Sequence, residues 1–194
     1  TGPFTNVALL LRVFPEVKER IEQIVLMGGA TFGGNITLSG EFNVYEDPEA
    51  AAIVFDSGLP VVMCGLDATM SVGLFREDNE LLLQSESEVV RSLGKMLRFY
   101  FECDSNDGFS RVHVHDAHTF MYILHPEIYR AVKMPVKVDC SEGLNRGATI
   151  CDPRKWAYKE EPNTTVLMEA DSAACSKYLV EAILSLGTKT KVQD

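Results

Sequence analysis

The sequence of 194 residues lacks the features that mark membrane proteins and nucleic-acid binders. Its apolar runs, such as residues 61–63 and 81–83, are far shorter than the roughly 20 residues that a membrane-spanning helix needs. The 18 Lys and Arg residues form no cluster that could neutralise phosphates, and the 28 Asp and Glu residues leave a net charge of −10. We therefore expect a protein that binds neither membranes nor nucleic acids, and a ligand that is small and neutral or cationic.

Signs of disulfide bonds and of export are lacking as well. The five cysteines form no CxxC pair, are odd in number and mostly lie in apolar stretches. We therefore expect reduced, buried thiols, with Cys64 as an inert core residue. No signal-peptide pattern is visible at the start, which favours the cytoplasm. The chain begins at Thr1, inside what reads as a loop, so we expect that an upstream segment is absent.

Helical patterns alternate with short apolar runs along the chain. Uninterrupted apolar runs predict buried strands at 24–27 and 60–66, and alternating segments predict a late hairpin or edge pair at 136–138 and 148–151. Thr5 and Asp47 are expected helix N-caps. The predicted helical regions are 5–14, 16–22, 48–57, 77–102 (in two pieces), 117–125 and 172–186. The pattern favours one α/β domain over residues 1–194, with an open, mostly parallel sheet and helices on both faces.

Ligands of such sheets gather outside the carboxyl ends of the strands. Three segments are expected there: Gly28-Gly29 after the first strand, Asp67 to Thr69 after the second, and Thr1. For Asp67 and Thr69 we favour a turn or helix cap over a role in a site. The three segments should share one edge of the sheet.

The loop after the first strand is the densest polar segment, with Asn35, Glu41 and Asn43. Asn can donate and accept hydrogen bonds, and Glu can accept from a pair of hydroxyls, which suits a polyhydroxylated ligand. The alternative is a loop held by its own bonds from side chain to backbone. Composition alone leaves both interpretations open.

A second group of titratable side chains consists of His113, His115, Asp116 and His118. Histidine can act as an acid or base near neutral pH, and Asp116 can bind a hard cation, cap a helix, or do both. Alternate spacing puts His113 and His115 on the same side of an extended segment, so a zinc pair in a zinc hydrolase is one interpretation. A structural role for these histidines is the other.

Seven short motifs occur in a characteristic order. They are TGPFTN at 1–6, MGG at 27–29, GN at 34–35, EFN at 41–43, DPEAA at 47–51, GLD at 65–67 with Thr69, and HD at 115–116. Each is weak alone, but the four between 27 and 51 are specific in combination. Across essentially its whole length, the chain resembles the inosine-uridine nucleoside hydrolase family. The resemblance implies a Rossmann-like α/β fold and hydrolysis of the N-glycosidic bond of ribonucleosides to ribose and free base.

The resemblance implies roles for the polar loop. Asn35, Glu41 and Asn43 would hold ribose hydroxyls, and Met27 would lie against the sugar. Breaking this bond builds oxocarbenium character on the sugar, so carboxylates and amides beside the ribose can stabilise the transition state over the ground state. The preferred base would be selected by a variable stretch, here residues 104–112.

The resemblance also implies a calcium ion that grips the ribose diol and a water. Asp116 would bind calcium and a ribose hydroxyl, and the backbone carbonyl of Thr1 would be a further calcium ligand. His115 stands where several family members have a histidine that assists departure of the base. A homo-oligomer is expected, because dimers and tetramers are common in the family.

The sequence departs from the family pattern at its amino-terminal end. The D-x-D-x-x-x-D-D motif, which supplies most calcium carboxylates and the general base, is not among these residues. Asp116 and one carbonyl cannot satisfy the roughly 6 to 8 oxygens that calcium takes. We therefore expect the carboxyl-terminal part of a nucleoside hydrolase, incomplete at its amino terminus and inactive alone. The alternative is a non-catalytic nucleoside- or ribose-binding or regulatory fragment. A smaller departure is Ala117-His118, where many members have Pro-Cys or Pro-Ala.

Overall fold

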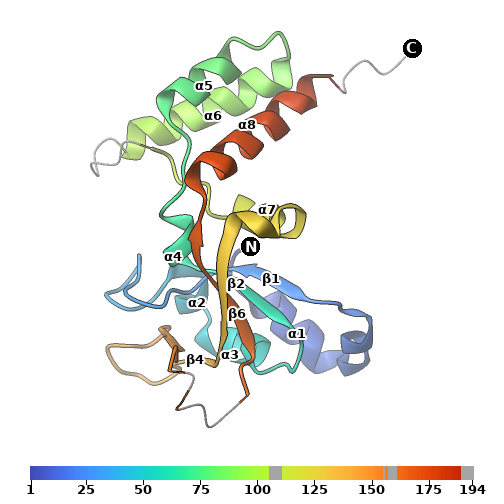
Figure 1. Ribbon diagram of the computed structural model, residues 1–194. Helices are drawn as coiled ribbons and strands as arrows, with labels where there is room; N and C mark the ends of the chain where they lie inside the picture. The colour runs from blue at the N-terminus through green and yellow to red at the C-terminus, as the bar shows by residue number, and fades with distance from the viewer. Residues whose placement is uncertain (105–110, 155, 157–160, 189–194) are drawn as a thin grey trace.

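The computed structural model describes residues 1–104, 111–154, 156 and 161–188. Its main sheet has four strands in the order β1-β2-β6-β3 (Figure 1). The strands β1 (Ile24–Met27), β2 (Val61–Cys64) and β6 (Thr164–Ala170) are parallel, and β3 (Tyr129–Met134) runs antiparallel beside β6. The expected open, mostly parallel sheet is therefore confirmed.

A second, two-stranded sheet is formed by β4 (Val136–Val138) and β5 (Thr149–Cys151). The two strands pair antiparallel, with Val136 opposite Cys151, which confirms the late hairpin. Val136 is fully buried in the same core cluster as α3, so the hairpin is attached to the body of the protein through this strand.

Eight α-helices and two 3-10 helices are assigned within the described residues. They are α1 (Thr5–Val13), η1 (Pro15–Arg20), α2 (Phe42–Tyr45), α3 (Pro48–Phe55), α4 (Leu66–Thr69), α5 (Arg76–Leu83), α6 (Glu88–Asp104), α7 (Ala117–Leu124), η2 (Pro126–Ile128) and α8 (Ser172–Thr188). Across those residues, no helix is both long and apolar enough to cross a membrane.

Helices cover both faces of the sheet, as expected. Successive side chains of a strand point to opposite faces, so the core cluster to which each side chain belongs shows what covers that face. Val61 and Met63 of β2 belong to a core cluster with residues of α1 and α3. Val62 and Cys64 belong to another cluster with residues of α4, α7 and α8. A fully buried, uninterrupted apolar strand results, which is the pattern of a parallel strand between two helical layers.

A third group of helices lies beyond one end of the sheet. The helices α5, α6 and α8 pack together there (Figure 1), around a cluster that contains Leu82, Val90 and Val180. The region expected to be helical from 77 to 102 is thus confirmed as two pieces, α5 and α6, joined by residues 84–87. Residues 105–110, most of the stretch expected to select the base, lie outside the described residues.

Several expected local details are wrong. Thr5 is the first residue of α1 and Phe4 is its N-cap, whereas Asp47 caps α3 as expected by accepting from Ala50 N. Gly65 is the N-cap of α4, so Asp67 lies inside that helix and caps nothing. Cys103 is exposed, unlike the buried thiol that its apolar surroundings predicted.

Candidate active site

The loops that follow β1 and β2 leave the sheet at the same edge. Met27 pairs with Cys64 at the last position of both strands, and beyond them Leu66 N donates to Gly29 O at 2.9 Å. Gly29 has φ of +75°, and a Cβ there would lie 2.8 Å from Thr149 Cγ2. Only glycine therefore allows this turn. Two of the three segments expected to share an edge, those after β1 and β2, are indeed together.

Glu41 is the most enclosed polar side chain of the loop, at 2% exposed. Its Oε2 accepts from Gly29 N at 2.9 Å and from Val44 N at 3.2 Å, and its Oε1 accepts from Asn43 N at 3.0 Å. The carboxylate thus caps α2 and fixes the glycine turn. Burial raises the pKa of Glu41, the three amides oppose this rise, and the negative charge of Asp116 adds to it.

The two asparagines hold the same loop. Asn43 is 7% exposed, and its Nδ2 donates to Met27 O at 3.1 Å and lies 3.4 Å from Met27 Sδ. Asn35 is exposed, and its Oδ1 accepts from Phe42 N at 2.9 Å. Side-chain bonds to the backbone therefore organise this loop, which agrees with the interpretation of a loop held by its own bonds.

The loop still has hydrogen-bonding capacity to offer a ligand. Glu41 uses three of roughly four acceptor positions of a carboxylate, and the fourth lies on Oε1. Within the described part of the chain, no partner is assigned to Asn43 Oδ1 or to Asn35 Nδ2. One carboxylate acceptor, an amide acceptor and an amide donor can thus face hydroxyl groups.

The histidine segment joins the site from another direction. His115 Nδ1 lies 2.8 Å from Thr69 Oγ1, and Thr69 is fully buried in the first turn after β2. Asp116 is exposed, and although it stands at the N-cap of α7, its side chain makes no capping bond. Asp116 directly follows His115, so the contact of His115 with Thr69 brings this carboxylate to the segment after β2. Asp116 thus stands at the expected N-cap position, but its side chain does not cap the helix.

The neighbouring histidines have structural partners. The rings of His113 and His115 stack at 5.8 Å, which confirms that they lie on the same side, and His113 Nδ1 is 2.8 Å from Val72 O. His118 is fully buried, with Nδ1 2.9 Å from Tyr129 OH, and burial lowers its pKa to about 4.

The amino-terminal segment reaches the same edge of the sheet. Thr1 is exposed, and Phe4 packs on the turn after β1, because a Cβ at Gly28 would lie 2.9 Å from Phe4 Cζ. The start of the chain lies near the ends of β1 and β2 (Figure 1), so the third expected segment meets the other two. Burial raises the pKa of Cys64, at the end of β2, to about 12.

A metal centre needs more ligands than these residues bring together. Among the described residues, no group of three or more His, Cys, Asp or Glu side chains could hold a metal ion. Asp116 and the Thr1 carbonyl fall short of the roughly 6 to 8 oxygens of calcium, so the residues present do not fit the ion by themselves. The zinc interpretation of His113 and His115 also lacks a third ligand within the described residues.

The roles of two contributors to this edge were missed at the sequence level. Asp67, expected to be a cap, accepts from Thr31 N at 2.8 Å and also from Thr31 Oγ1. Thr149, on β5, bonds to both the N–H and the C=O of Ala30. Asp67 was expected at this edge from its position after a strand and only its role was wrong, whereas nothing in the local sequence around Thr149 pointed to this edge.

Comparison with known proteins identifies the family. The model of the inosine-uridine preferring nucleoside hydrolase family matches residues 1–177. The chain belongs to this family. The resemblance inferred from the seven motifs is therefore confirmed.

Relatives of this nucleoside hydrolase chain are longer than it is. The pyrimidine-specific ribonucleoside hydrolase RihA of Citrobacter koseri is 39% identical over 185 residues, which cover 94% of this chain and 59% of the relative. The RihA of Shewanella woodyi is 37% identical with the same coverage. The chain thus spans 59% of the length of these curated relatives.

A solved structure agrees in fold. The purine-preferring ribonucleoside hydrolase from Gardnerella vaginalis superposes with a TM-score of 0.88 at 31% identity, over 96% of this chain and 60% of that one. The expected nucleoside hydrolase fold is therefore confirmed.

Proposed function

We propose that this chain supplies the ribose-binding half of an active site that hydrolyses the N-glycosidic bond of ribonucleosides to ribose and free base. The observation that carries the proposal is the meeting of the segments after β1 and β2 at one edge of the sheet, where Glu41 holds the Gly29 turn and Thr69 holds His115. Family membership over residues 1–177 and relatives named ribonucleoside hydrolases support it.

The ribose hydroxyls are assigned to three side chains of the loop. The remaining acceptor position on Glu41 Oε1 and the amide groups of Asn35 and Asn43 match a ligand whose hydroxyls both donate and accept. Met27 is assigned to the sugar as well, because its Sδ lies 3.4 Å from Asn43 Nδ2. A rigid carboxylate beside the ribose stabilises positive charge that develops on the sugar in the transition state.

His115 is assigned to the departing base. Its bond to the buried Thr69 sets the plane of the imidazole, and a held ring can donate a proton or a hydrogen bond without first losing rotational freedom. Asp116, the next residue, then lies on the ribose side.

Asp116 and the Thr1 carbonyl are proposed as two ligands of a calcium ion, with the other ligands contributed by groups outside this set. Because the two cannot complete the coordination of calcium, we expect the 194-residue chain alone to release no base. Relatives are named both pyrimidine-specific and purine-preferring, so the proposed substrate class is ribonucleosides in general. A homo-oligomer and a cytoplasmic location in nucleoside salvage belong to the same proposal.

Calorimetric titration of the chain with ribose, inosine and uridine, with and without calcium, tests the proposal. We expect binding that calcium strengthens, and no base released in an absorbance assay. Asp116→Asn should abolish the calcium effect, because Asp116 is exposed and makes no capping bond, so the fold should persist. Glu46→Gln, an exposed carboxylate at the end of α2, is the matched control. Absence of binding under all conditions would overturn the proposal, and calcium-dependent turnover by this chain would overturn its expected inactivity.

A non-catalytic ribose- or nucleoside-binding role is the second candidate. The observation that favours it is that Glu41, Asn35 and Asn43 all bond to backbone groups of the protein, so the loop is organised by its own side chains. Ribose binding that is unchanged by calcium and by Asp116→Asn would support this role over the first.

A further inference from the structure

The hairpin of β4 and β5 contacts the proposed ribose-binding loop at Ala30, where both backbone polar groups bond to one hairpin side chain. Thr149 Oγ1 accepts from Ala30 N at 2.9 Å and donates to Ala30 O at 2.6 Å. Thr149 is 5% exposed and Ala30 is also buried. Buried backbone groups need hydrogen-bond partners, and here one hydroxyl satisfies both polar groups of a residue that lies in no helix or strand.

Ala30 directly follows Gly29, whose amide binds Glu41 in the proposed ribose-binding loop. Gly29 N donates to Glu41 Oε2, and Ala30 N, the next amide, donates to Thr149. A Cβ at Gly29 would lie 2.8 Å from Thr149 Cγ2, so the threonine methyl group also packs on this turn. The position of Thr149 therefore sets the direction of the amide that binds Glu41.

The hairpin also contacts the middle of the same loop. Ser39 Oγ donates to Leu144 O at 3.2 Å. Gly147 has φ of +80° and approaches Tyr45 so closely that a Cβ at Gly147 would lie 2.8 Å from Tyr45 Cα. The hairpin backbone is thus pressed against the loop near α2, the helix that Glu41 caps.

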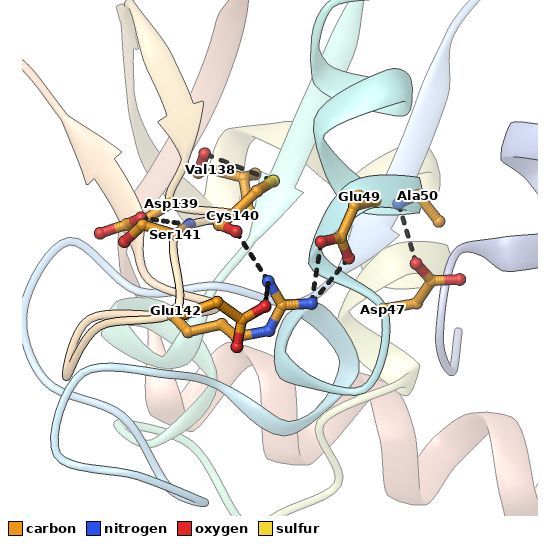
Figure 2. Close-up of polar contacts among 9 residues, drawn as sticks. Asp47, Glu49, Ala50, Val138, Asp139, Cys140, Ser141 and Glu142 are labelled. Atoms are coloured by element: carbon orange, nitrogen blue, oxygen red, sulfur yellow. Dashed lines mark hydrogen bonds and ion pairs between the residues drawn. The ribbon is translucent and has the colours of Figure 1, made fainter.

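A third contact fixes the far end of the loop. Arg146 Nη2 donates to both carboxylate oxygens of Glu49, at 2.8 and 2.9 Å, and Arg146 Nη1 donates to Cys140 O at 2.7 Å (Figure 2). Glu49 lies in the first turn of α3, two residues after the N-cap Asp47. The guanidinium thus connects the loop of the hairpin to α3, the helix that follows the ribose-binding loop. Its hydrogen bonds also lower the pKa of Glu49.

We infer that the hairpin is a clamp and that Thr149 is a positioning residue, which acts on the ribose through Glu41 without touching it. The hairpin holds the loop of residues 30–49 at its start through Thr149 and at its end through Arg146. The role in ligand positioning rests on the proposed function, whereas the mechanical role rests on the contacts alone.

Amide hydrogen exchange in the full chain without ligand tests the mechanical role. Thr149→Val keeps the shape and β-branching of the side chain but removes both bonds to Ala30, so the amides of Gly29, Ala30 and Asn43 should exchange roughly tenfold faster. Thr149→Ser keeps the hydroxyl and should restore slow exchange. Thr164→Val is the matched control, since Thr164 is a fully buried strand threonine whose hydroxyl donates to Asn163 Oδ1, away from the loop.

The clamp is overturned if Thr149→Val and Thr164→Val change the amide exchange rates of residues 28–44 equally, or if these amides exchange as fast in Thr149→Ser as in Thr149→Val.

Ribose titration of the same variants tests positioning. The Kd for ribose should rise about tenfold in Thr149→Val and stay near the wild-type value in Thr149→Ser. Equal Kd values in the two variants would overturn positioning. A wild-type chain that binds no ribose would overturn the proposed function, while the exchange data would still decide the clamp.

Discussion

The two halves of the candidate site are held together by different means. In the loop after β1, Glu41 bonds to a backbone amide 12 positions away and Asn43 to a carbonyl 16 positions away. In the histidine segment, His113 and His115 bond to residues 41 and 46 positions away, on the segment after β2. The loop therefore takes part of its geometry from bonds within itself and part from the hairpin, whereas the histidine segment is held by the segment after β2.

The difference affects how each half can carry a ligand. Glu41 and Asn43 are buried and use most of their hydrogen-bonding capacity on the backbone, so they can present only a rigid edge to a sugar. Asp116 is exposed and makes no capping bond, so it can move toward a ligand or cation. The candidate site thus combines a preorganised loop with an adaptable carboxylate.

The largest effect is expected from Glu41→Gln. An amide can replace one acceptor but places a donor against backbone N–H groups, so buried donors lose their partner. We expect the free energy of unfolding to fall by about 3 to 4 kcal/mol, measured by urea denaturation, together with loss of ribose binding. Glu46→Gln, exposed at the end of α2, is the control. A loss below about 1 kcal/mol would contradict the view that the loop organises itself through this carboxylate.

A pH-dependent effect is expected in the histidine segment. Burial lowers the pKa of His118 from 6.5 to about 4, so between these values the unfolded chain takes up a proton that the folded chain does not. The contribution of His118 to stability is complete above pH 6.5 and is lost as the pH falls, at about 1.4 kcal/mol per pH unit. Urea denaturation between pH 7 and 5 should show this slope in the wild type and a smaller slope in His118→Cys. Equal slopes would show that His118 does not titrate differently in the folded chain.

Thr69→Val tests whether the two halves are independent. The change removes the partner of His115 Nδ1, and we expect a loss of about 1 kcal/mol in stability. Faster amide exchange should be confined to residues 111–118 and 69–72, while residues 28–44 keep the wild-type rates. Thr69→Ser retains the hydroxyl and serves as control. Faster exchange in both halves would mean that they form one cooperative unit.

The smallest effect is expected from Glu49→Gln, at the exposed end of the clamp. The Glu49 side chain is 57% exposed, and ion pairs of this kind contribute under about 1 kcal/mol because water and salt screen them. Urea denaturation at low and high salt should show a small loss that disappears at high salt. A loss as large as that of Thr149→Val would mean that Arg146, and not Thr149, carries the clamp.

Much of the architecture could be predicted because its signals are local. The apolar runs at 24–27 and 60–66 contain β1 and β2, and Asp47-Pro48 marks the start of α3. The order of motifs identified the family, which the match over residues 1–177 confirms. The predicted roles of Met27, Asn35 and the other site residues stay predictions, although the structure brings the segments after β1 and β2 to one edge and bonds His115 to Thr69 there.

Errors arose where neighbours in space decided the outcome. Asp67 looked like a cap because it follows a strand, but Gly65 already begins α4 and the carboxylate bonds instead to Thr31. Asp116 was considered as a cap because a helix follows it, and it does occupy the N-cap position of α7, yet its side chain makes no capping bond. Sequence patterns report propensities for caps, but they do not report which competing partner lies closer.

The sequence by itself determined which segments are strands and helices, that the loops after β1 and β2 share an edge, and which polar residue types gather there. These features depend on apolar periodicity, glycine and capping residues within one segment. Only the tertiary structure decided which acceptor positions of Glu41 are occupied, what orients His115, and that Thr149 supports the loop from 119 positions away. The physical reason is that a hydrogen bond requires two groups to lie within about 3 Å of each other in space. Contacts between residues far apart in the chain produce no periodic pattern in the sequence.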